Sequence, residues 1–299
     1  STVRDNVVNI AKLLNYVPRS INASQATVNL TVQTIQSSGS YPSTVTLKKG
    51  AVATGGSYIW NITSDTTAEV NSTTGIATFS NLILKEGSIV TFQYVVNTFA
   101  TQNYKVPSED ADINTLSVRV KANESSTTSD LYNLVDTITG LTANTRVYFL
   151  SEGEDMRYEV KFGDDSVGRA LKDGEVVMFE YLVTSGEEAN DVDRFSYTGR
   201  MTDTLGQSYS PAAVTLTKVA RSQNGTAAET IESIKYNAPR FYSSQYRAVT
   251  AGDYAILTKK VYPNADAVVA YGGDSLNPPV YGKVYVAVKT ATGATLNDQ

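Results

Sequence analysis

Alternation of apolar and polar residues dominates the first two-thirds of the chain and predicts short β-strands. Val28, Leu30 and Val32 alternate with Thr and Asn residues, and the run from Val90 to Val96 alternates most regularly. Because neighbouring side chains of a strand point to opposite faces, each such run has one apolar face to bury. Further strands are expected at residues 44–47, 58–62, 77–79, 116–120, 146–150, 157–162 and 175–183. In residues 175–183 both faces are apolar, so we expect this strand to be covered on both sides.

Helical spacing of apolar residues occurs near the two ends of the chain. Residues 3–15 carry Val and Leu at helical intervals, and Pro18 is expected to end that helix. Thr226 and Glu229 have the spacing of a capping box, which predicts a helix near residues 226–236. Thr250 and Asp253 have the same spacing and predict a second helix at residues 251–261.

The end of the chain therefore predicts a different fold class from the rest. The two C-terminal helices are followed by an expected short buried strand at residues 267–271 and an expected half-buried strand at residues 284–288. A chain of 299 residues is also too long for one comfortable core. We predict a mainly β, multidomain protein with a C-terminal α+β region. Its expected domains are residues 1–103 (N-terminal helix plus β domain), 104–218 (β domain) and 219–299 (α+β domain, helix-helix-strand-strand).

The charge pattern argues against two classes of partner. The net charge is −5, and Lys and Arg gather only in pairs such as Lys48-Lys49, so no phosphate-binding footprint is expected and nucleic acid is excluded as a partner. No apolar run approaches the ~20 residues of a membrane span, so no membrane partner is expected. The chain begins with Ser1 and no Met and has no signal-peptide pattern, so we expect a processed or excised piece that continues beyond Gln299.

The chain contains no Cys and no His. Disulfide scaffolds, zinc sites of the Cys/His kind, Cys nucleophiles and Ser-His-Asp triads are therefore excluded. Chemistry would have to come from carboxylates, Lys or Tyr.

Two acidic segments are candidates for such chemistry. The turn Gly163-Asp164-Asp165-Ser166 offers hard oxygen ligands for Ca²⁺ or Mg²⁺, but it lacks the spacing of an EF-hand loop, and we interpret it as a β-turn. Glu152, Glu154 and Asp155 suggest paired acid and base carboxylates, but a charged loop between strands explains them as well. We predict no catalytic residue, no cofactor-binding residue and no metal ligand.

The glycine pairs at residues 55–56 and 272–273 are interpreted as turns. Neither pair lies in a phosphate-binding motif such as a P-loop or a dinucleotide-binding turn.

Three blocks of sequence carry a resemblance to a known family. The first is SSQYRAVTAGDYAIL followed by VYPNADAVVAYGGDSLNPPVYGKVYVAVK, the second is YEVKFGDDSVGRALKDGEVVMFEYLVTSGEEAN at residues 158–190, and the looser third is YKVPSEDADINTLSVRV at residues 104–120. In this order the blocks resemble the C-terminal part of the baseplate wedge proteins of contractile-tailed phages of the T-even type, the baseplate-J-like family.

The resemblance implies a structural virion protein of the tail baseplate, assembled in the host cytoplasm, and not an enzyme. It implies no cofactor, a homo-oligomer that is a dimer within a ring, contacts to other baseplate wedge proteins, and rearrangement when the sheath contracts. Arg247 matches the family pattern R-A-V-T-x-x-D-Y, which implies that it ties its loop to the following helix or to a partner. A plain surface arginine is the alternative.

Two other classes of function remain open at this point. An extracellular bacterial adhesin or surface-layer domain would also be β-rich, acidic and poor in Cys, but it would be β throughout, so two real helices near the C-terminus would favour the baseplate interpretation. A carboxylate-dependent glycan hydrolase would need two acidic side chains facing each other across a cleft.

Overall fold

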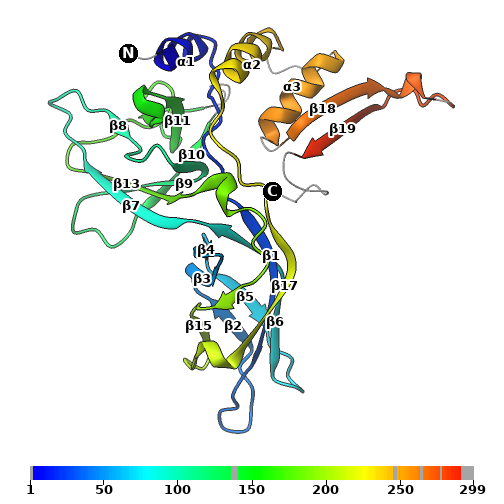
Figure 1. Cartoon of the computed structure of the whole chain (residues 1–299). Coiled ribbons are helices and arrows are strands. Elements are labelled where there is room, and N and C mark those ends of the chain that lie inside the picture. The colour runs from blue at the N-terminus through cyan, green and yellow to red at the C-terminus, as the bar shows by residue number, and fades with distance from the viewer. Residues whose placement is uncertain are drawn as a thin grey trace. The chain divides into compact units, whose positions relative to one another are not determined.

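The computed structural model describes residues 3–135, 141–244, 248, 250–262, 265–276 and 278–290, excluding the side chains of Glu154, Ser244, Asp266 and Asp274. The chain is mainly β, with two helices and two strands at its C-terminal end, as the sequence predicts. It forms two compact units (Figure 1): unit 1 contains residues 1–21, 90–181 and 227–299, and unit 2 contains residues 22–89 and 182–226. The division into three consecutive domains stays a prediction.

Unit 2 is built from two β-sheets that share one core. The six-stranded sheet has the order β14 (Ser196–Tyr197), β3 (Gly50–Gly55), β4 (Tyr58–Ile62), β6 (Ile76–Glu86), β1 (Gln25–Gln33) and β17 (Val214–Gln223). The four-stranded sheet has the order β16 (Ser208–Tyr209), β15 (Met201–Asp203), β2 (Thr44–Leu47) and β5 (Thr66–Glu69). Leu30 and Trp60 from the first sheet and Leu47 from the second belong to the same buried cluster. The period-2 apolar faces predicted from the sequence therefore meet between the two sheets.

Unit 1 contains a seven-stranded sheet. Its order is β7 (Ser88–Val95), β13 (Val176–Val183), β9 (Ala111–Lys121), β10 (Asp130–Leu134), β11 (Val147–Glu152), β12 (Tyr158–Phe162) and β8 (Tyr104–Lys105). In β13, Val177 and Phe179 on one face and Val176 on the other are all buried, which confirms the expected burial on both sides. Tyr94, Tyr104 and Phe162 make successive edge-to-face ring contacts at 5.5 and 5.4 Å.

Helix α1 (Val3–Leu13) packs against helix α2 (Ile231–Ser244) in unit 1. Val8 and Ala11 from α1 form a buried cluster with Ile234 and Ala238 from α2. The predicted N-terminal helix is confirmed, but its predicted apolar stripe is wrong: Val3, Ile10 and Leu13 are exposed, and the face that meets α2 carries Val8 and Ala11.

The predicted capping box of Thr226 and Glu229 is wrong. The backbone of Thr226 pairs with Asn22, and α2 begins at Ile231, five residues later than the proposed cap. Thr230 accepts hydrogen bonds at the start of α2, from the backbone N–H of Ser233 to its hydroxyl (3.3 Å) and from that of Ile234 to its carbonyl (3.0 Å). Glu229 does not cap α2 because its carboxylate is buried and bound by donors from elsewhere.

Glu229 receives hydrogen bonds from both ends of unit 1. Its carboxylate accepts from the hydroxyl of Tyr16 at 2.9 Å and from the backbone N–H of Arg19 at 3.0 Å. From α2 it accepts from the hydroxyl of Ser233 at 2.7 Å and from the side-chain amide of Asn237 at 3.1 Å. Burial, with the charge of Glu229 beside it, raises the pKa of the Tyr16 phenol. The carboxylate thus joins the segment after α1 to the first turns of α2.

We expect Glu229→Gln to lower the free energy of unfolding by about 3 kcal/mol, because the amide replaces one acceptor oxygen with a donor and leaves buried donors unpaired. Urea denaturation at neutral pH measures this change. Glu232→Gln on the same helix is the control: Glu232 pairs with Lys235 at the surface, so its loss is expected to cost less than about 0.5 kcal/mol. Equal effects of the two substitutions would contradict the role given to Glu229.

Candidate functional site

The two aspartates of the acidic turn, Asp164 and Asp165, stabilise that turn by accepting backbone hydrogen bonds. The Asp164 carboxylate accepts from the backbone N–H groups of Ser166 and Val167, both at 2.9 Å, and these bonds lower its pKa. The Asp165 carboxylate accepts from the backbone N–H of Ala170 at 2.8 Å. Both carboxylates are therefore used to hold their own turn, as the β-turn interpretation predicts.

Glu152 lies in a structural ion pair with a residue that the sequence did not suggest. Its two carboxylate oxygens accept from the guanidinium of Arg4 at 2.8 and 3.1 Å, and its side chain is almost fully buried. Burial raises the pKa of Glu152 despite the opposing effect of Arg4. Asp155 is exposed, and the side chain of Glu154 lies outside the described residues. Since Glu152 is already occupied by Arg4, it is not poised as one half of a hydrolase pair.

Other predicted positions have simple outcomes. Gly56 has φ +60° in the turn between β3 and β4, which confirms that turn. Gly272 ends strand β18 (Ala265–Gly272), and Gly273 opens the short 3₁₀ turn Gly273–Ser275. Arg247 lies outside the described residues.

Within the described part of the chain, no three Asp, Glu, His or Cys side chains lie close enough together to hold a metal ion. Among the described helices, none has both the length and the apolar character needed to cross a membrane.

The most distinctive surface is carried by helix α3 (Ala251–Val261) and the antiparallel pair of β18 with β19 (Val284–Thr290). The predicted capping box is confirmed: the Asp253 N–H donates to the Thr250 hydroxyl (3.2 Å), and the Thr250 N–H donates to the Asp253 carboxylate (2.8 Å). α3 contacts β18 and α2. We refer to α3, β18 and β19 together as the C-terminal module.

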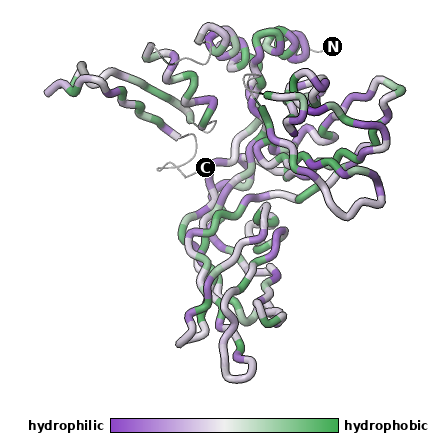
Figure 2. Tube along the Cα trace, turned by 180° about the vertical axis from the view of Figure 1, so that it is seen from behind, coloured by the Kyte–Doolittle hydropathy of each residue, from purple (hydrophilic) through white to green (hydrophobic). Residues whose placement is uncertain are grey.

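The C-terminal module leaves apolar residues uncovered. No described residue of α3 is buried, and Val261 at its end is 81% exposed. On one face of the strand pair lie Ala267, Val269, Tyr271, Tyr285, Ala287 and, at one end, Lys289, which we call the open face. Val269 is 60% exposed, and Tyr281 before β19 is 79% exposed. Figure 2 shows apolar positions along both strands of this hairpin.

The opposite face of the strand pair is partly protected. Val268, Ala270 and Val288 are half-buried there and α3 contacts β18, whereas Val284 and Val286 are 44% and 40% exposed. On the open face, by contrast, Tyr271 and Tyr285 stack with ring centroids 5.8 Å apart. Two strands and one helix are too few to enclose a core by themselves. Large exposed apolar patches of this kind mark interaction surfaces.

The sequence predicts these elements, but the predicted burial of the strand at residues 267–271 is wrong, since Val269 and Tyr271 are 60% and 38% exposed in a two-stranded ribbon that no second layer of the described chain covers on this face. The sequence also did not predict the network that α2 shares with the N-terminal segment. Arg4 and Tyr16 carried no local signal for their partners, since Glu152 and Glu229 lie far away in the sequence.

The burial of the Glu152 carboxyl group predicts that the stability of the protein depends on pH. The pKa of Glu152 is higher in the folded protein than in the unfolded chain, where glutamates titrate near about 4.3. The folded protein therefore keeps the Glu152 proton to a higher pH. As the pH rises from about 4.3 towards the folded-state pKa, the contribution of Glu152 to the free energy of unfolding falls. We expect Glu152→Gln to lose this dependence, so the stability of the unmodified protein relative to this variant decreases as the pH rises above about 4.3. Urea titrations at several pH values measure the difference, and Glu124→Gln on an exposed loop is the control. A difference that rises with pH would contradict the assignment.

Comparison with known families gives one match. Residues 250–299 match the family described as baseplate structural protein gp6, C-terminal domain I. The matched segment includes the C-terminal module and is a minor part of the chain. No curated protein matches.

The match is to a baseplate family, and the two helices that separate the baseplate interpretation from an all-β adhesin are present. The comparison therefore supports a structural role in a phage baseplate, in association with other baseplate proteins and located in the tail of the virion.

Proposed function

We propose that this protein is a wedge subunit in the ring of a contractile-tail baseplate, that it acts without catalysis, and that it associates with itself and with other wedge proteins through the C-terminal module. The baseplate-J-like resemblance of the two upstream blocks forms part of this proposal. We further propose assembly in the host cytoplasm and rearrangement of these contacts on sheath contraction.

The observation that carries the proposal is the uncovered apolar surface of the matched segment. Val261, Val269 and Tyr281 are each more than half exposed in a module that is too small to bury them itself. Apolar and aromatic side chains that lose their contact with water on association supply most of the binding free energy of stable interfaces. A second copy of the chain is the partner we propose for the open face, since identical patches on a two-fold axis cover each other.

The rest of unit 1 holds the C-terminal module in place and leaves its apolar face available to a partner. The Glu229 network and the α1–α2 cluster fix α2, and α2 contacts α3. The module is therefore attached to a well-packed part of unit 1 while its own apolar face stays open. We propose residues 219–299 as the assembly domain on this ground.

We expect Val269→Lys to raise the concentration needed for self-association by about tenfold or more, because it places a charge in the centre of the open face. Sedimentation equilibrium of the whole chain over a range of concentrations measures the change. Val95→Lys is the matched control: Val95 lies on β7, outside residues 219–299, and is also 48% exposed, so its substitution should leave the association unchanged.

A chain that is monomeric at every concentration would overturn self-association through this module. Equal weakening by the two lysine substitutions would show that the added charge acts non-specifically, and the interface would then have to be sought elsewhere.

A further inference from the structure

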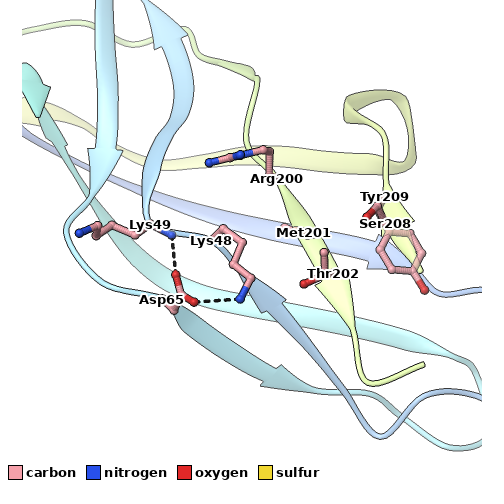
Figure 3. Close-up of a pocket in the computed structure, with 8 residues that line it drawn as sticks. All are labelled: Lys48, Lys49, Asp65, Arg200, Met201, Thr202, Ser208 and Tyr209. Carbon is pink, nitrogen blue, oxygen red and sulfur yellow. Dashed lines mark hydrogen bonds and ion pairs between the residues drawn. The ribbon is translucent and has the colours of Figure 1, made fainter. Parts of the chain in front are cut away.

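A pocket of about 570 Å³ in unit 2 lies at one end of the four-stranded sheet. It is lined by Lys48, Lys49, Asp65, Arg200, Met201, Thr202, Ser208 and Tyr209 (Figure 3). Lys48 and Lys49 follow β2, Asp65 precedes β5, Arg200 precedes β15, and Ser208 belongs to β16. All four strands therefore contribute to the pocket, and the antiparallel pairing brings its polar residues together.

The pocket carries an excess of positive charge. It has three cationic side chains, Lys48, Lys49 and Arg200, against the single carboxylate of Asp65, which leaves an excess of two, whereas the whole chain has a net charge of −5. Both oxygens of Asp65 are already engaged: Oδ1 accepts from the backbone N–H of Lys49 (2.8 Å) and Oδ2 from the ammonium of Lys48 (3.0 Å). These bonds, the first of them most strongly, lower the pKa of Asp65. The carboxylate is thus fixed in place, and like charges gathered around it favour an additional anion.

The remaining lining residues complete a site for an oxyanion. Thr202 and Ser208 are directly opposite each other in the pairing of β15 with β16, so their hydroxyls lie on the same face of the sheet. Met201 and Tyr209 also border the pocket, but their side chains are buried in the core on the face of the sheet opposite to Thr202 and Ser208. The Tyr209 hydroxyl donates to Asp203 at 2.6 Å and is therefore committed to the protein itself. Guanidinium, ammonium and hydroxyl groups are all donors to carboxylate oxygens.

We propose that this pocket binds the carboxylates of an acidic polypeptide segment. Arg200, Lys49 and Ser208 are exposed, so the charged groups are open to a macromolecule, whereas small-molecule sites bury most of their ligand within apolar walls. Three cations are too few for the extended phosphate track that nucleic-acid binding uses. The pocket also lies beside β16, the end strand of its sheet, whose outer edge can pair with an extended peptide.

Dye-labelled hexaglutamate with blocked ends is the probe, and fluorescence anisotropy with the whole chain at low ionic strength is the measurement. We expect binding that is lost at about 0.5 M salt, since exposed charges are screened. Arg200→Ala is expected to weaken binding about fivefold. Asp65→Asn is expected to tighten it about threefold, because it removes the competing negative charge while keeping an acceptor for Lys49.

Arg221→Ala and Asp191→Asn are the matched controls. Arg221 and Asp191 form an exposed ion pair elsewhere in unit 2, at 3.5 Å, and their substitutions make the same changes in net charge. Each control should alter the affinity by less than about 1.5-fold. Equal effects in the pocket and the control pair, or no binding of hexaglutamate, would overturn the proposal.

A single-stranded oligonucleotide of similar charge is the competing probe. Tighter binding of the oligonucleotide, with the same dependence on Arg200, would overturn the choice of an acidic polypeptide and identify a phosphate site. None of these results depends on the C-terminal module, so the pocket proposal stands or fails independently of the proposed baseplate role.

Discussion

The buried carboxylate of Glu229 is the constraint on which the arrangement of unit 1 depends. A carboxylate removed from water is costly unless hydrogen bonds replace its hydration, and here the donors come from both sides of the chain. Tyr16 and Arg19 follow α1, while Ser233 and Asn237 belong to α2. Neither pair of donors alone replaces the hydration of the carboxylate. The segment after α1 and the first turns of α2 must therefore both be in place to satisfy Glu229. The small apolar cluster between α1 and α2 then forms where this polar network brings the helices into contact.

The two helical parts of unit 1 differ in how far their apolar side chains are buried. At the α1–α2 end, Arg4 and Glu152 pair in addition to the Glu229 network, and Tyr158 donates to the carbonyl of Pro18 at 2.7 Å. In the C-terminal module β18 and β19 pair with each other, yet valines and tyrosines remain in contact with water. A two-stranded ribbon pairs only one edge of each strand, and it cannot enclose an apolar core. This difference is why the module folds into a definite shape but still presents a surface that another molecule can cover.

Local patterns in the sequence predicted local structure well. The alternation at residues 28–32 became β1, and the Thr250–Asp253 box was confirmed in both of its hydrogen bonds. The strands β14, β15 and β16 were missed because two or three residues are too few to show a period. Thr226 and Glu229 matched the capping box only in spacing, since the donors that claim Glu229 are set by the tertiary fold. Long-range partners such as Arg4 and Glu152 leave no trace in a single sequence.

The excess of positive charge in the pocket also depends on the tertiary fold and could not be predicted from the sequence. Along the sequence, Lys48-Lys49 is only a pair, and the overall charge is negative, so composition argues against any strongly cationic surface. The fold brings Arg200 next to this pair because β15 pairs with β2 in antiparallel register, with Met201 opposite Leu47. That register is set by the core, since Met201 and Leu47 are both fully buried on the inner face. The requirement to bury two apolar side chains therefore places Arg200 in the same pocket as Lys48 and Lys49, and a local excess of charge arises that neither the composition nor the linear pattern contains.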